Sequence, residues 1–253
     1  MSRALGIILL LLPLHLHART LEYVGTAMAP DTQQAIYSEA YTEQFNADGI
    51  LQRITVDYRR PDGSALAHKT LDYARHPYAP AFDFHNRATG YQESLTWLND
   101  GRVRLRHQDA GKSAQEKILR VPEPVVADAG FNQYVRDHLP QLKAGQTRRF
   151  HFLNPARLDW FAFTARIIAS DSNTLTVEVA PASRVLRWLV DPIELVYGET
   201  DGRLLQYRGL TNISLDKGDT LSAHIHYIYQ DDSNTALLLD TKALEYRLTP
   251  PEG

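Results

Sequence analysis

The sequence predicts a mainly β fold: a strongly curved antiparallel meander, of half-barrel or β-clam type, with one covering helix near 130–142. Turn signals of the Asp-Gly and Asn-Gly kind recur along the chain, and such pairs favour hairpins because glycine tolerates positive φ. Between them, short segments alternate apolar and polar residues, as strands with one buried face do. The turn signals are "ADG" (47–49), "PDG" (61–63), "NDG" (99–101), "DAG" (109–111), "TDG" (200–202) and "DKGD" (216–219).

The clearest strand is predicted at residues 50–60, where Ile50, Ile54, Val56 and Tyr58 share one face. Charged and hydroxyl side chains share the other face. Alternation of this kind indicates one face against a core and one face against water or a wet cavity. The same pattern predicts strands at 101–108, 174–180, 192–199 and 222–230.

A helix is expected at 128–146, because apolar residues recur there at helical spacing. Asp128 is a candidate N-cap, and Pro140 is expected to end the regular part of the helix. Residues 182–191 are consistent with a short helix or a strand. Their valine and tryptophan, with Pro192 close behind, favour a strand. The apolar positions of the expected helix are Phe131, Tyr134, Val135, Leu139 and Leu142.

The N-terminus has the features of a secretory signal peptide over residues 1–18. Arg3 gives a positive start, an apolar run follows, and cleavage is predicted after Ala18. The alternative is an uncleaved membrane anchor, but the apolar run is shorter than the roughly 20 residues that a membrane span needs. The mature chain is therefore expected in a bacterial periplasm, as a single antiparallel β domain over 19–248 with a tail at 249–253.

Composition narrows the classes of function. The chain has 253 residues and no cysteine, so neither a disulfide nor a thiolate metal site is expected. The net charge of −3 argues against nucleic acid as a partner, since that would need a basic surface. No stretch beyond the N-terminus is long and apolar enough to suggest a transmembrane segment in the mature chain. A proline-rich loop at 120–130 suggests a waist within the β domain.

The common catalytic motifs are missing: the chain has no G-x-S-x-G, H-E-x-x-H, Walker or G-x-G-x-x-G pattern. Neither an enzyme nor a cofactor is therefore predicted. His224 and His226 share one face of the strand at 222–230 and form a weak alternative metal site. The plainer interpretation is two partly exposed histidines on a polar face. A third metal ligand would have to come from His151, His107 or His68.

Aromatic residues concentrate in the C-terminal half. One interpretation is ordinary core, in which each buried ring stabilises the fold by about 1.5–3 kcal/mol. The other is an apolar groove on the concave side of a bent sheet, suited to an acyl chain or another hydrophobic ligand. On the strand at 222–230, the tyrosine face rather than the histidine face is expected to line such a groove. The groove candidates are Phe150, Phe152, Phe161, Phe163, Trp188, Tyr197, Tyr207, Tyr227 and Tyr229.

Two segments of the chain resemble a group of uncharacterised secreted proteins of Gram-negative bacteria. They are "DAGFNQYVRDHLPQLKAGQTRRFHFLNPARLDW" (128–160) and "VLRWLVDPIELVYGETDGRLLQYRGLTNISL" (185–215). The layout is also remotely similar to that of the periplasmic lipoprotein carriers LolA and LolB, which wrap a curved antiparallel sheet around a helical lid and hold acyl chains. The resemblance implies a compartment and a fold, and no ligand-binding residue carries over by position.

Three hypotheses of function follow. The favoured one is a soluble periplasmic binding or carrier module, whose apolar groove takes a lipid-like or other hydrophobic small molecule. The alternative is an envelope protein-protein interaction or regulatory module, which uses a sheet face or edge and needs no ligand cavity. The third is a histidine-based metal enzyme built on His224 and His226.

Overall fold

The structure, a computed structural model, describes residues 18–183, 185–188, 190–216 and 220–230. Apart from Ala18, the expected signal peptide lies outside these residues, as does the expected tail at 249–253. The described strands are β1 (Arg19–Met28), β2 (Ala35–Phe45), β3 (Leu51–Arg59), β4 (Ala65–Asp72), β5 (Ala81–Asn86), β6 (Gln92–Trp97), β7 (Val103–Gln108), β8 (Gln115–Leu119), β9 (Val125–Ala127), β10 (Arg148–Asn154), β11 (Asp159–Ser170), β12 (Thr174–Pro181), β13 (Ile193–Gly198), β14 (Leu204–Leu210) and β15 (Ser222–Tyr229).

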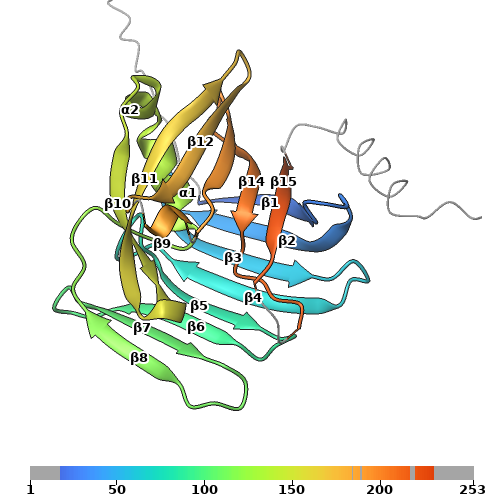
Figure 1. Ribbon diagram of the computed structural model, residues 1–253, viewed down its shortest axis with the longest axis vertical. Helices are drawn as coiled ribbons and strands as arrows, with labels where there is room; N and C mark the ends of the chain where they lie inside the picture. The colour runs from blue at the N-terminus through green and yellow to red at the C-terminus, as the bar shows by residue number, and fades with distance from the viewer. Residues whose placement is uncertain (1–17, 184, 189, 217–219, 231–253) are drawn as a thin grey trace, which may run out of the picture.

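All of these strands belong to one sheet, and the pairing among them is antiparallel except between β9 and β10 (Figure 1). The mainly β, antiparallel fold that the sequence predicts is thus confirmed. The strand order is β8-β7-β6-β5-β4-β3-β2-β1-β15-β14-β13-β12-β11-β10-β9. Two meanders are therefore joined at a central seam between β1 and β15, where Tyr23 lies opposite Tyr229.

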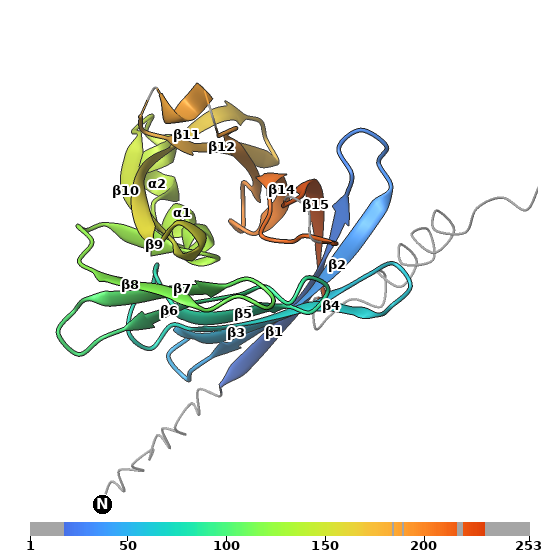
Figure 2. The ribbon, with the colours of Figure 1, turned by 60° about the horizontal axis from the view of Figure 1, so that its bottom comes forward.

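The sheet is curled so strongly that its two ends approach each other. Strands β8 and β9 lie at opposite ends of the sheet, yet residues 120–124 alone connect them. A link of this length spans at most about 20 Å. Lys117 of β8 also forms an ion pair of 3.2 Å with Asp159 of β11. In Figure 2, strands β10–β12 arch over the helices while β1–β8 form the broad layer below. The expected waist at 120–130 includes the connection at 120–124, where the chain passes from one end of the sheet to the other.

The described helical segment is divided in two, where one continuous helix was expected. Helix α1 covers Gly130–Asp137 and helix α2 covers Leu139–Lys143. Asp128 is not the N-cap: its φ is +44°, outside the helical region, and its carboxylate contacts another strand. Pro140 does not end the helix but lies in the first turn of α2, where its missing N–H costs no hydrogen bond.

Helix α1 packs inside the curl of the sheet. The ring of Tyr134 lies 5.0 Å from that of Phe150 on β10, and 5.3 Å from that of Tyr78 in the β4–β5 connection. Gly130 permits this close packing, because a Cβ at that position would lie 1.9 Å from the backbone oxygen of Tyr78. None of the described helices is long and apolar enough to cross a membrane.

Local predictions are mostly confirmed in the described residues. The glycines of the turn signals at 47–49, 61–63, 99–101, 109–111 and 200–202 all have positive φ. Most of the last turn signal lies outside the described residues, since 217–219 are not described.

Two further local expectations were wrong. The described residues within 182–191 do not form a strand but include the short 3-10 helix η2 (Leu186–Trp188), because this segment leaves the sheet between β12 and β13. Ile50 lies before the start of β3 and is 60% exposed, while its expected neighbours Ile54, Val56 and Tyr58 are buried. A second 3-10 helix, η1 (Pro155–Arg157), connects β10 to β11.

A buried ion pair connects the two meanders across the curl. The ammonium of Lys69, on β4, lies 2.7 and 2.9 Å from the two carboxylate oxygens of Asp128, which directly follows β9. The exposed fractions of the two side chains are 6% and 11%. Charges so far from water interact strongly, and loss of one partner leaves the other unpaired.

Replacing Lys69 by methionine is expected to lower the free energy of unfolding by about 3–5 kcal/mol, because Asp128 would remain buried without a cation. The control is Lys117→Met, which breaks an ion pair between side chains that are each 48% exposed and should cost about 1 kcal/mol or less. Chemical denaturation of the two variants measures the difference. Equal losses would contradict the importance given to the buried pair.

Candidate functional site

A row of stacked tyrosines crosses the central seam on the concave face of the sheet. Tyr41, Tyr23 and Tyr229 lie opposite one another on β2, β1 and β15. The ring centroids of Tyr23 and Tyr41 are 4.6 Å apart, and those of Tyr23 and Tyr229 are also 4.6 Å apart. Tyr227 lies across Gly25, where a Cβ would be 2.7 Å from its ring. The glycine therefore lets the Tyr227 ring cross β1 toward β2.

Two buried carboxylates lie among these rings. Glu39 accepts hydrogen bonds from the hydroxyls of Tyr41, at 2.8 Å, and Tyr227, at 3.4 Å. Glu43 accepts one from Tyr23 at 2.9 Å. Glu39 and Glu43 are only 4% and 3% exposed. Burial raises the pKa of both carboxyls, and the tyrosine hydrogen bonds oppose that rise. We call these four tyrosines and two glutamates the tyrosine–glutamate cluster.

The cluster is covered only in part. Tyr23 is buried, whereas Tyr41, Tyr227 and Tyr229 are half-buried. On the far side of Tyr229, the guanidinium of Arg203 lies 5.0 Å from the ring centroid.

Further buried polar groups surround the cluster. The hydroxyl of Tyr197 has no hydrogen-bond partner among the described residues, although this side chain is 0% exposed. Tyr37 is 1% exposed, and its hydroxyl interacts with Glu39 and Thr211. Burial raises the pKa of Tyr37 far above its ordinary value, and the nearby carboxylate of Glu39 adds to the rise. Buried hydroxyls normally have a partner, so their position indicates a polar interior.

A third buried carboxylate belongs to Glu93 on β6, which accepts a hydrogen bond of 2.9 Å from the hydroxyl of Tyr91. Burial raises the pKa of Glu93 to about 7. The carboxylate of Asp128 adds to the rise, and the ammonium of Lys69 opposes it. The interior of the curl thus holds several carboxyl groups around one buried lysine.

The nine groove candidates separate into three places. Tyr197, Tyr207, Tyr227 and Tyr229 lie in the interior of the curl. Trp188 is 91% exposed in η2 and lies apart from the others. The phenylalanines belong to the β10–β11 hairpin, where Phe150 is fully buried and the others are half-buried: Phe152, Phe161 and Phe163.

Sequence reasoning missed the part of the cluster that β1 and β2 supply. The signal was present in "YSEAYTEQF" (37–45), where Tyr37, Glu39, Tyr41 and Glu43 alternate with other residues and so share one face. This pattern was missed because glutamate side chains were expected to face solvent. On β15 the faces are as expected, with Ile225 buried and His226 exposed on the opposite side.

The histidines do not converge. His224 and His226 lie on the outward face of β15, whereas the suggested third ligands lie on other strands: His68 on β4, His107 on β7 and His151 on β10. No group of three or more histidine, cysteine, aspartate or glutamate residues that could hold a metal is found among the described residues.

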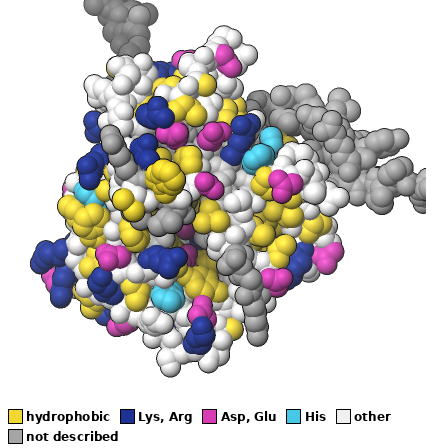
Figure 3. All heavy atoms as spheres, in the orientation of Figure 1, with side chains coloured by type: hydrophobic (Ala, Val, Ile, Leu, Met, Phe, Trp, Pro, Cys, Tyr) yellow, Lys and Arg dark blue, Asp and Glu magenta, His cyan; other side chains and the backbone are white. Residues whose placement is uncertain are grey.

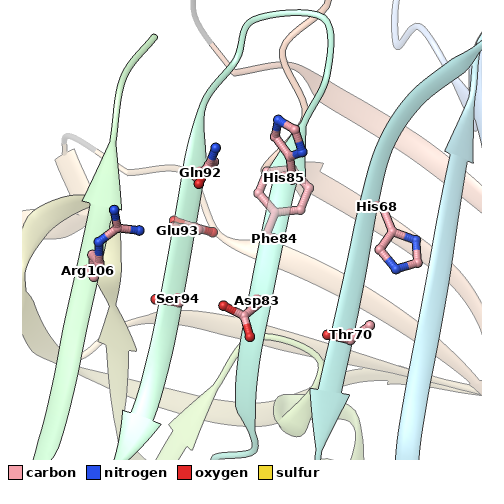
Figure 4. A pocket seen from close by; sticks show the side chains of 9 residues that line it. All are labelled: His68, Thr70, Asp83, Phe84, His85, Gln92, Glu93, Ser94 and Arg106. Carbon is pink, nitrogen blue, oxygen red and sulfur yellow. The ribbon is translucent and has the colours of Figure 1, made fainter. Parts of the chain in front are cut away.

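A shallow polar hollow of about 180 Å³ lies on the outer face of β4–β7 (Figure 4). His68 and His85 lie opposite each other there, and the Nδ1 atom of His68 lies 2.8 Å from Asp57. Phe84 and Glu93 belong to the same strands but are buried on the concave side. The hollow is therefore separated by the sheet from the tyrosine–glutamate cluster.

Comparison with known proteins adds no family to this geometry. No model of a protein family matches the chain, and no curated protein sequence matches it significantly.

Glu93→Gln is expected to stabilise the protein by about 1–3 kcal/mol at pH 8. The folded protein keeps the Glu93 proton up to about pH 7, whereas the unfolded chain releases it near the ordinary value of 4.5. The folded state therefore binds more protons between these pH values, and stability falls as the pH rises through this window. Denaturation curves from pH 4 to pH 8 measure this slope, which the variant should reduce. An unchanged slope would contradict the assignment, and Glu22→Gln, on the outward face of β1, is the control.

Proposed function

We propose that the protein is an exported binding or carrier module of the bacterial periplasm, which holds a hydrophobic or amphipathic small molecule against the concave face of the sheet. The observation that carries the proposal is the row of tyrosine rings on the concave face, in which Tyr41, Tyr227 and Tyr229 are only half-buried. Ligand sites are typically concave and aromatic, with a few polar groups that orient the ligand. The tyrosine–glutamate cluster has this composition.

The aromatic composition of the cluster supports the same proposal. Figure 3 shows hydrophobic side chains on one face of the molecule, interspersed with charged ones. Aromatic rings bury a large area at a small entropic cost, so a ligand lying on them gains much of its binding energy from desolvation. The polar groups behind the rings favour a ligand with a polar end over a purely apolar one.

Native mass spectrometry of the protein purified from its host, together with uptake of a fluorescent fatty acid or fatty amine, tests the proposal. Replacing Tyr227 by leucine should weaken probe binding about threefold to tenfold, because the probe loses one aromatic face. Ile228→Ala is the control, since Ile228 lies on the same strand but faces outward. Absence of any bound lipid, combined with no uptake of either probe, would overturn the proposal.

A second candidate function has one specific observation in its favour. Trp188 and Val185 are 91% and 72% exposed between β12 and β13, which is unusual for such apolar side chains. Arg187 fixes this segment by donating from Nε to the backbone oxygen of Pro181 at 2.7 Å. A protein-protein interaction or regulatory module of the cell envelope would use such a segment as a contact.

Trp188→Ala distinguishes the two functions. For an interaction module, cross-linking in the cell envelope should lose its partner in this variant, while uptake of the fluorescent probes stays unchanged. For a carrier without such a contact, the cross-linking pattern of the variant should equal that of the unchanged protein.

A further inference from the structure

We infer that His76 is an acid-sensitive switch: when its ring takes up a second proton from solvent, it releases the turn that holds β9 and α1 against the first meander. The inference goes beyond the proposed binding function, because it concerns how the curl opens and is independent of what the curl binds. Three features of the β4–β5 connection at 73–80 lead to it: the hydrogen bonds that His76 accepts, the contacts of Tyr78, and the surroundings of the His76 ring.

His76 is the hydrogen-bond acceptor of its own turn. Its Nδ1 atom accepts from the backbone N–H groups of Tyr78, at 3.1 Å, and Ala79, at 2.9 Å. Elsewhere in the chain Asn86 and Asp171 accept in this way from the N–H groups two and three residues further on. Amide and carboxylate oxygens stay acceptors near neutral pH, whereas a histidine nitrogen becomes a donor when it is protonated. His76 therefore gives this turn a dependence on protons that the other two turns lack.

The positions of the ring protons follow from these hydrogen bonds. Because Nδ1 accepts, the single proton of the neutral ring is on Nε2, which lies 3.5 Å from a carboxylate oxygen of Glu123 in the connection at 120–124. A second proton would have to bind Nδ1, where it would point at the N–H groups of Tyr78 and Ala79. Ala79 is 0% exposed, so its N–H would lose its acceptor without reaching water. The protonated ring is therefore incompatible with the turn.

The turn holds the second meander through Tyr78. The backbone oxygen of Tyr78 accepts a hydrogen bond of 3.0 Å from the N–H of Ala127 on β9, and the Tyr78 hydroxyl donates one of 3.0 Å to Asp137 of α1. The ring of Tyr78 also packs 5.3 Å from that of Tyr134 on α1. Loss of the turn would therefore free β9 and α1 together.

The surroundings of the ring oppose its protonation. The ring of His76 stacks on that of Trp97 on β6, with centroids 5.3 Å apart, and the His76 side chain is only 17% exposed. Burial lowers the pKa of His76 from its ordinary value of 6.5, and the carboxylate of Glu123 opposes this fall. Tyr78 also faces the ring, but it stays uncharged because its pKa is raised to about 12.

The sign of the pH dependence follows. Below about pH 6.5 the unfolded chain takes up a proton at His76 before the folded protein does, so the contribution of His76 to stability is lost as the pH falls. Glu93 acts in the opposite direction, since its contribution is lost as the pH rises. The two groups are therefore separated by comparing variants and not by the pH profile of one protein.

Hydrogen exchange followed by mass spectrometry, at pH 7.5 and pH 5.0, tests the inference. Exchange rates are corrected for their intrinsic dependence on pH. Protection of residues 125–137 should fall about tenfold or more at the lower pH, because the two hydrogen bonds that His76 accepts are lost. Protection of β12 and β13, in the middle of the second meander, should stay constant.

His76→Asn is the decisive variant, because an amide oxygen can accept from both N–H groups without titrating, as Asn86 does. The protection of residues 125–137 in this variant should be equal at the two pH values. His85→Asn, which removes an exposed histidine from β5, is the control and should respond to acid as the unchanged protein does.

Three results would overturn the inference: constant protection of residues 125–137 in the unchanged protein, an equal fall in β12 and β13, or a fall that persists in His76→Asn. If His76→Asn does not fold by circular dichroism, NMR titration of the His76 ring nitrogens in the unchanged protein takes its place. The inference requires a proton on Nε2 at pH 7.5 and a titration midpoint below 6.5. A proton on Nδ1, or a midpoint at or above that value, would contradict it.

Discussion

The short connection at residues 120–124 is the constraint on which the rest of the structure depends. It joins β8 to β9, which lie at the two ends of the described sheet, so the sheet must curl until those ends approach. The curl gives the sheet a concave face, and α1 enters that space directly after β9. The ion pair between Lys69 and Asp128 then connects the first meander to the start of α1. An open, flat sheet with the same strands would have neither an interior nor a place for these charges.

The curl explains why polar side chains become buried. The period of two along a strand places Tyr37, Glu39, Tyr41 and Glu43 on one face of β2, and the curl takes that face away from water. Tyrosine hydroxyls satisfy part of the hydrogen-bonding capacity of the carboxylates. An interior chosen only for stability would be apolar, because buried charges rarely repay their loss of hydration. Under the proposed function, the same residues that weaken the fold in this way would orient the ligand.

Features that depend on adjacent residues could be predicted from the sequence. Features that depend on how the two ends of the sheet approach each other could not. Glycines such as Gly63 and Gly101 mark their hairpins, and the alternation around Val56 marks a strand, since both depend on a few adjacent residues. The contact between Lys69 and Asp128 joins positions far apart in the chain, so no local pattern reveals it. Asp128 was expected to cap a helix because local preference favours aspartate at that position. In the structure its carboxylate instead pairs with Lys69, which is distant in the sequence.

The central claim is that the concave face of the curled sheet takes its carboxyl groups out of water. The most direct measurement is a pH titration of the protein by carbon-13 NMR, with the glutamate side-chain carboxyl carbons labelled and assigned. The account predicts that Glu93 titrates near pH 7, and that Glu39 and Glu43 titrate above the ordinary glutamate value of 4.5. Titration of all three at or below that ordinary value would contradict it, because the concave face would then be open to water.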